Sequence, residues 1–294
     1  MSKKRFEKRK VWAGVGTALL ATSAATATAE QSDTDALTAL SSSVVSYSAM
    51  SLGEGGESGG EGGGEGGGEG GGEGGEGEGE GSSSVNLATD NAAYLARLGL
   101  IRGHLWVGLK LYREGHIAMA KTHMKHPEDE LYAGLPPVFK ARGVSGFAEE
   151  LSALADAVNN EQGDEAVETA YEQLLKAISK SEGMSSMTAK ETLMSISQMI
   201  RTAAEEYAIG VKKGEVVNVH EYQDAYGFTE IAIERLERLS DEQKQQAEAE
   251  IAHTKALLLE LRTLWPTVNP QGDVEGDASH LFGAAARIEL SALK

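Results

Sequence analysis

The sequence contains no cysteine among its 294 residues, and this absence excludes several kinds of chemistry. Without thiols the chain cannot form disulfides, bind metal through thiolates, hold an iron–sulfur cluster or attach haem covalently. Aromatic residues are also scarce, at 5%, and only five prolines occur. The stability of the folded part must therefore come from core packing without covalent crosslinks.

Long apolar runs and catalytic motifs are missing as well. Beyond the N-terminal stretch, no run approaches the roughly 20 apolar residues that span a bilayer. There is no nucleophile elbow, phosphate loop, dinucleotide fingerprint or His-Glu-x-x-His pair. The formal charge is −18, which repels nucleic acid and anionic membranes and attracts cations. We therefore expect no enzyme, no bound nucleotide, no nucleic-acid partner and no membrane insertion of the mature chain.

The N-terminus has the pattern of a bacterial export signal. A basic stretch from Lys3 to Lys10 precedes an Ala-rich apolar run from Val11 to about Ala25. The small-x-small pattern of a cleavage site follows and ends at Ala29. The sequence thus predicts a signal peptide over residues 1–29, cleaved near Ala29, and a periplasmic or secreted protein.

Two low-complexity segments come next. Residues 30–52 are rich in Ser, Ala and Thr, and residues 53–81 are almost entirely Gly and Glu. Neither segment has enough apolar surface to offset the entropy lost on ordering. We expect a disordered segment over 30–52 and a flexible, self-repelling linker over 53–81.

Residues 86–294 show helical periodicity in almost every segment. Two capping boxes, Thr188-x-x-Glu191 and Ser240-x-x-Gln243, mark helix starts, and Pro127 is expected to end a helix. The fold class expected is all-α, with about eight helices after a disordered N-terminal tether. The short connections favour an antiparallel bundle or stacked helical hairpins, as one domain or as two halves over 86–180 and 186–294.

Four of the seven histidines lie between positions 104 and 126, on a predicted helical hairpin that turns at Gly115. Residues equally far from such a turn face each other, as His104 and His126 do. His123 and His126 share a helix face because they are three residues apart. The spacing brings His104, His123 and His126 to the open end of the hairpin, whereas His116 lies beside the turn.

Glu130 follows this cluster by about one further turn and could reach the same place. Three imidazoles and a carboxylate suit iron, copper or zinc when sulfur is absent. The sequence therefore predicts a metal site made by His104, His123, His126 and Glu130. The alternative is that these histidines only serve packing and helix ends.

A second segment, residues 214–228, contains Glu221 and Asp224 three residues apart, with His220 adjoining them. This spacing predicts a secondary, oxygen-rich cation site at Glu221 and Asp224. The alternative is an amphipathic helix whose first turn carries carboxylates because the helix dipole favours them there.

The same segment resembles the helical periplasmic regions that accompany bacterial iron permeases of the iron/lead transporter family. The matching positions are Glu221, Tyr222, Gly227 and Phe228, which follow a turn. The resemblance implies a role in periplasmic iron handling. The permease's Arg-Glu-Gly-Leu-Glu motif and its spanning helices are absent from the sequence, so the resemblance implies an accessory protein and not the channel.

These observations lead to one functional hypothesis and one alternative. The hypothesis is an exported helical protein that binds a transition metal, iron first, and hands it to, or senses it for, a membrane transport partner. The alternative is a non-catalytic helical scaffold that docks another exported protein and needs no metal.

Overall fold

The computed structural model describes residues 85–294, and all structural statements concern that part of the chain. The expected signal peptide over 1–29, the segment 30–52 and the linker 53–81 lie outside the described residues. The described part is all-α, as the sequence predicts, and has ten α-helices where about eight were expected. Among these helices, none combines the length and apolar character needed to cross a bilayer.

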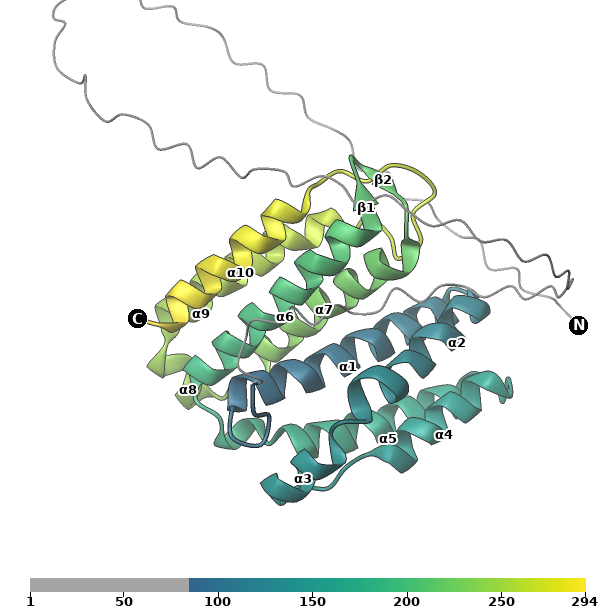
Figure 1. Cartoon of the computed structure of the whole chain (residues 1–294), viewed down its shortest axis with the longest axis horizontal. Helices are drawn as coiled ribbons and strands as arrows, with labels where there is room; N and C mark the ends of the chain where they lie inside the picture. The colour runs from purple at the N-terminus through teal and green to yellow at the C-terminus, as the bar shows by residue number, and fades with distance from the viewer. Residues whose placement is uncertain (1–84) are drawn as a thin grey trace, which may run out of the picture. The chain divides into compact units, whose positions relative to one another are not determined.

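Most elements follow one another through short connections, and a longer segment, residues 265–277, separates η3 from α10 (Figure 1). The first half of the described chain contains α1 (Asn91–Arg113), α2 (Ile117–His126), the π-helix η1 (Pro127–Tyr132), α3 (Pro136–Arg142), α4 (Ala148–Asn159) and α5 (Asp164–Glu182). The second half contains the 3₁₀-helix η2 (Met184–Ser186), α6 (Ala189–Gly210), β1 (Val211–Lys212), β2 (Glu215–Val216), α7 (Val219–Glu237), α8 (Asp241–Gln246), α9 (Glu248–Leu261), the 3₁₀-helix η3 (Arg262–Leu264) and α10 (Ala278–Ala292).

Helices α1 and α2 form the predicted hairpin. Asp90 caps α1 by accepting a hydrogen bond from the backbone N–H of Ala93. Gly115 takes a φ of +82° in the turn, a conformation that glycine adopts without strain. Helix α2 ends at His126, directly before Pro127, as the sequence predicts. The chain continues as the π-helical turn η1, because proline at a first helical position has no N–H to lose.

Helices α6 and α7 form a second hairpin, and both predicted capping boxes are present, one at the start of α6 and one at the start of α8. Thr188 starts α6 with its reciprocal bonds to Glu191, and Ser240 starts α8 in the same way with Gln243. The turn expected at residues 212–214 connects β1 and β2, which pair antiparallel with Val211 opposite Val216. The sequence predicts no strand there, because strands of two residues are too short to show an alternating pattern.

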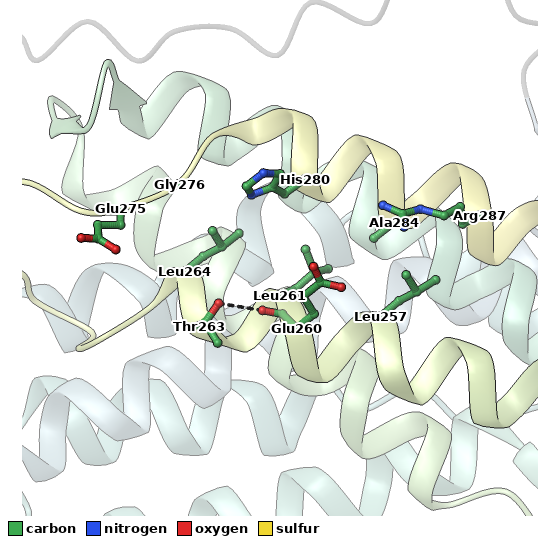
Figure 2. Close-up of a pocket in the computed structure, with 10 residues that line it drawn as sticks. All are labelled: Leu257, Glu260, Leu261, Thr263, Leu264, Glu275, Gly276, His280, Ala284 and Arg287. Carbon is green, nitrogen blue, oxygen red and sulfur yellow. Dashed lines mark hydrogen bonds between the residues drawn. The ribbon is translucent and has the colours of Figure 1, made fainter. Parts of the chain in front are cut away.

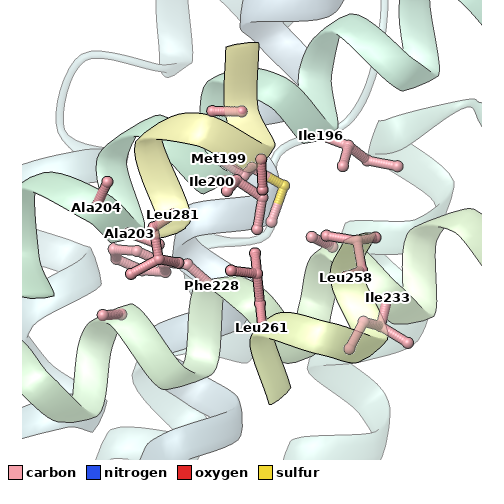
Figure 3. Packing of buried hydrophobic residues seen from close by; sticks show 14 of the residues in the cluster. Ile196, Met199, Ile200, Ala203, Ala204, Phe228, Ile233, Leu258, Leu261 and Leu281 are labelled. Atoms are coloured by element: carbon pink, nitrogen blue, oxygen red, sulfur yellow. The ribbon is translucent and has the colours of Figure 1, made fainter. Parts of the chain in front are cut away.

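The largest hydrophobic cluster fills the space between α6, α7, α9 and α10. Its apolar side chains come from all four helices, and Figure 3 shows ten of them labelled: Ile196, Met199, Ile200, Ala203, Ala204, Phe228, Ile233, Leu258, Leu261 and Leu281. The burial of this aliphatic surface is the main driving force for the bundle. These four helices are therefore a four-helix bundle with one contiguous core.

A second hydrophobic cluster joins α1 to α2, α3, α4 and α5. Leu98, Leu105 and Phe147 are among its fully buried members. Helix α1 lies between the two clusters, since it packs on α6 and α7 on one side and on α2 on the other (Figure 1). This central position of α1 places its histidine against α7.

Two glycines let α1 and α7 approach closely. A Cβ atom at Gly227 of α7 would overlap the backbone carbonyl of Gly103, and one at Gly103 would lie 2.5 Å from the Phe228 ring. Neither position tolerates a side chain without moving a helix. His104 follows Gly103 directly, and Asp224 lies one turn before Gly227, so the close crossing brings these two residues together.

Candidate functional site

The site lies where the α1–α2 hairpin meets the first turns of α7. Two groups of possible metal ligands occur there in the described residues, His104 with His123 and Asp224, and His220 with Glu221 and Asp224. Within each group, the ligand atoms all lie within 4.8 Å of one another. Asp224 belongs to both groups, so the two sites predicted separately from the sequence meet at one carboxylate.

The inner group is almost completely buried. The side chains of His104, His123 and Asp224 are 8%, 0% and 3% exposed. Oδ1 of Asp224 lies 2.6 Å from Nδ1 of His104 and 3.1 Å from Nδ1 of His123. These three atoms lie close together, yet none of them has a hydrogen-bond partner of regular geometry. Buried polar atoms are nearly always paired, so this arrangement calls for an explanation.

Gln223 fixes the tautomer of His123. Its amide Nε2 donates to the backbone carbonyl of Val268 at 3.1 Å, which turns its Oε1 toward the imidazole. Nε2 of His123 donates to that oxygen at 2.8 Å and therefore carries the proton. Nδ1 of His123 is then an unprotonated acceptor facing Oδ1 of Asp224. Sequence reasoning missed Gln223, because an isolated glutamine on a helix gives no signal of its partners.

The outer group is more accessible. Nδ1 of His220 lies 3.2 Å from Oδ2 of Asp224 and 4.0 Å from Oε2 of Glu221. The side chains of His220 and Glu221 are 22% and 26% exposed. The ring of His220 stacks on that of His123, with centroids 4.2 Å apart and planes 7° from parallel. Nε2 of His220 is buried without a hydrogen-bond partner.

The other two residues of the predicted site, His126 and Glu130, lie at the rim. Nδ1 of His126 is 3.2 Å from Oε2 of Glu130, and both side chains are about one third exposed or more. The His126 ring remains near the centre, 6.1 Å from that of His104 and 4.6 Å from that of His220. His116 caps the N-terminus of α2 and takes no part in these contacts.

The electrostatics follow from burial and charge. Burial raises the pKa of the Asp224 carboxyl, but the imidazoles of His104 and His123 outweigh it and hold that pKa well below its usual range. Burial lowers the pKa of His123 by more than Asp224 raises it, which favours the neutral imidazole. Burial also lowers the pKa of His220, yet Glu221 and Asp224 reverse this and raise it overall. The centre therefore pairs an ionised carboxylate with a neutral, ligand-competent imidazole.

Aromatic and polar contacts hold the α7 side in place. The Phe228 ring meets that of His104 edge to face at 5.0 Å. Tyr222 is fully buried, its hydroxyl donates to the carbonyl of Thr267 at 2.9 Å, and its own carbonyl accepts from Trp265 Nε1 at 3.2 Å. These contacts fix the first turns of α7 against the loop after η3, and with them the orientation of Asp224.

A separate cavity of about 310 Å³ opens between α9, η3 and α10 (Figure 2). Leu257, Leu261 and Leu264 supply apolar surface, and charged groups such as Glu275 and Arg287 also line it. None of its lining residues belongs to the histidine cluster, and none carries a buried unpaired polar atom. The histidine cluster is therefore the stronger candidate for chemistry.

Comparison with known proteins identifies the second half of the described chain. Residues 181–291 match the family model described as the iron permease-associated 4-helix bundle domain. The match covers less than half of the chain and includes α6, α7, α9 and α10, the four helices of the largest core. No curated protein and no solved structure matches the sequence. Asp224, His220 and Glu221 lie inside the matched segment, whereas His104 and His123 lie before it.

Proposed function

We propose that this protein binds a transition metal, iron first and then copper or zinc, at a centre formed by His104, His123 and Asp224. The observation that carries the proposal is the contact between Nδ1 of His123 and Oδ1 of Asp224. His123 carries its proton on Nε2 and donates it to Oε1 of Gln223. Nδ1 of His123 and Oδ1 of Asp224 are therefore both acceptors, and they lie 3.1 Å apart.

Such a contact is unfavourable in a buried place unless a cation lies between the acceptors. Either a proton or a metal ion could be that cation. A metal ion draws lone pairs of several ligands to one point, and it accounts for the unpaired Nδ1 of His104 as well.

The donor set narrows the identity of the ion. Two imidazoles and one carboxylate are a common ligand set for Fe²⁺, and histidine-rich sites also take copper and zinc. Calcium and magnesium prefer sites made of oxygen atoms and fit less well. Iron is placed first because the matched domain is described as iron permease-associated.

The proposal includes export and delivery. The N-terminal pattern favours a protein outside the cytoplasm, and the matched domain is named for an association with iron permeases. The protein would bind the ion outside the cytoplasm and pass it to, or sense it for, a membrane permease. His126 and Glu130 at the half-exposed rim give the ion a route between the centre and solvent.

The test is metal binding by the full chain purified without a histidine tag. Iron, copper and zinc would be measured by mass spectrometry after gel filtration, and Fe²⁺ affinity by anaerobic titration. The variants His104→Ala and His123→Ala are compared with His253→Ala, whose exposed histidine lies on α9 away from the cluster.

Stoichiometric metal in the wild type and in His253→Ala, lost in both cluster variants, supports the proposal. No retained metal, together with a wild-type melting temperature that added ions leave unchanged, overturns it. The helical scaffold without a metal would then be the working account. Circular dichroism of each variant separates loss of ligands from loss of fold.

A further inference from the structure

The carboxylate of Asp224 faces different ligand sets with its two oxygens. Oδ1 faces the Nδ1 atoms of His104 and His123, whereas Oδ2 lies 3.2 Å from Nδ1 of His220. Glu221, on the same turn as His220, adds a second carboxylate on the outer side. A carboxylate that presents one oxygen to each of two ligand sets has the arrangement of a bridging ligand.

We infer that the centre holds two metal ions bridged by Asp224. The inner ion is bound by His104, His123 and Oδ1 of Asp224, and the outer ion by His220, Glu221 and Oδ2. The inference rests on the proposed function, because it assumes that the inner position binds metal. Protein sites of this kind hold their two ions about 3.5–4 Å apart.

The spacing of the ligands is compatible with one ion in each group. Ligand atoms about 2.0–2.2 Å from an ion lie at most about 4.4 Å from one another. Each of the two groups has all its ligand atoms within 4.8 Å, so small side-chain adjustments bring them to bonding distance.

The surrounding charge favours a second cation. Asp224 alone offsets only part of the charge of one divalent ion in a buried place. Glu221 lies on the outer side, and the charge of Glu130 acts on His220. The three carboxylates of Asp224, Glu221 and Glu130 thus offset most of the charge of two divalent ions.

The two positions differ in access. The inner ligands are at most 8% exposed, whereas His220 and Glu221 are 22% and 26% exposed. The outer ion therefore exchanges with solvent directly, and the inner ion reaches solvent past the outer position. The outer position is the one from which an ion leaves toward a partner.

The test counts ions and measures their coupling in the full chain, with Co²⁺ and Mn²⁺ as probes. Native mass spectrometry and calorimetry give the number of Co²⁺ ions bound. Electron paramagnetic resonance of the Mn²⁺ form shows whether two ions share a bridge, since bridged ions give an exchange-coupled spectrum. The key variant is Glu221→Gln, which keeps the side-chain volume at a part-exposed position, with Glu275→Gln in an exposed loop as its matched control.

We expect two ions and a coupled spectrum in the wild type and in Glu275→Gln, and one uncoupled ion in Glu221→Gln. One ion in the wild type that disappears in His104→Ala overturns the bridged pair and leaves the proposed function standing. Two ions without coupling overturn the bridge. No ion in any form overturns both, and equal melting temperatures of the metal-free proteins exclude unfolding as the cause.

Discussion

Nδ1 of His104 on α1 lies 2.6 Å from Oδ1 of Asp224 on α7, across a distance of more than one hundred residues in the sequence. The contact joins the hairpin that carries the histidines to the segment that matches the iron permease-associated domain. Neither part alone contains the inner group. The centre therefore depends on the packing of α1 against α7 as much as on its ligands.

The substitution Asp224→Asn separates a metal centre from a structural ion pair. The amide loses the negative charge, so we expect metal affinity to fall by more than about 100-fold, beyond the usual loss for a residue that only orients a ligand. The amide N–H can instead donate to Nδ1 of His123, which removes the contact between two acceptors. The loss of the Asp224 charge, which His104 and His123 stabilise, opposes this gain, so the metal-free variant should melt close to the metal-free wild type.

Calorimetric titration measures the metal affinity of the variant, and thermal unfolding followed by circular dichroism measures its melting temperature without metal. The exposed residue Asp241 offers a control, Asp241→Asn, that changes charge by the same amount. If Asp224 instead served as the partner of a protonated histidine, its replacement would destabilise the metal-free protein strongly. A marked fall in the melting temperature without metal would therefore contradict our account.

The substitution Gln223→Leu tests the assignment of the His123 tautomer. Leucine removes the acceptor for Nε2–H of His123 but leaves every proposed ligand in place. Residues that orient metal ligands typically contribute 10–100-fold to affinity, and we expect a weakening within about this range. The number of bound ions should not change. Loss of all binding, or an unchanged affinity measured in the same titration, would speak against an orienting role.

The substitution Gly227→Ala tests the close crossing of α1 and α7. The added methyl would overlap the backbone carbonyl of Gly103, so the helices must move apart. We expect the unfolding free energy to fall by about 1–3 kcal/mol, the usual cost of overpacking, and metal affinity to fall with it. The control is Gly134→Ala, because a Cβ there meets nothing within 4 Å. Urea unfolding measures the stability of both variants. A Gly227→Ala protein as stable as Gly134→Ala would contradict the close approach of α1 and α7.

Local signals in the sequence predicted much of the fold. The capping boxes at Thr188 and Ser240 and the turn at Gly115 depend on neighbouring residues only, and the structure has them where the sequence predicts. The π-helix after Pro127 was not predicted, because proline usually ends such a pattern and nothing nearby marks a π-helical turn.

The geometry of the candidate site was less predictable. Local spacing placed His104 and His123 together, since they belong to one hairpin. It could not place Asp224 beside them, because that contact depends on the close approach at Gly103 and Gly227. In a sequence, glycines inside helical patterns indicate weaker helices, and nothing shows which distant glycine faces them. The same long-range packing places His126 and Glu130 at the rim.

A buried ion-pair network around Glu182 yields a prediction about acid stability. Glu182 is fully buried and contacts Arg235 at 3.0 Å and Arg238 at 2.8 Å, while Arg102 lies 3.5 Å away. Burial raises the pKa of this carboxyl, but the three guanidinium groups outweigh it and lower the pKa from 4.5 to about 2. Because the network links α1, α5 and α7, its charge state affects the packing that positions the histidines.

A carboxyl with a lowered pKa in the folded state stabilises the protein above its unfolded pKa, and this contribution is lost as the pH falls from about 4.5 toward 2. The shift corresponds to about 3 kcal/mol at neutral pH.

Glu182→Gln removes the charge and leaves Arg235 buried without a counter-ion, so we expect a loss of about 3–5 kcal/mol near pH 7. The difference between wild type and variant should shrink as the pH approaches 2.5. Urea unfolding from pH 7 to 2.5 measures it, with the exposed Glu172→Gln as control. A difference that stays constant with pH would mean that the Glu182 charge does not stabilise the fold, because only a proton-dependent contribution disappears in acid.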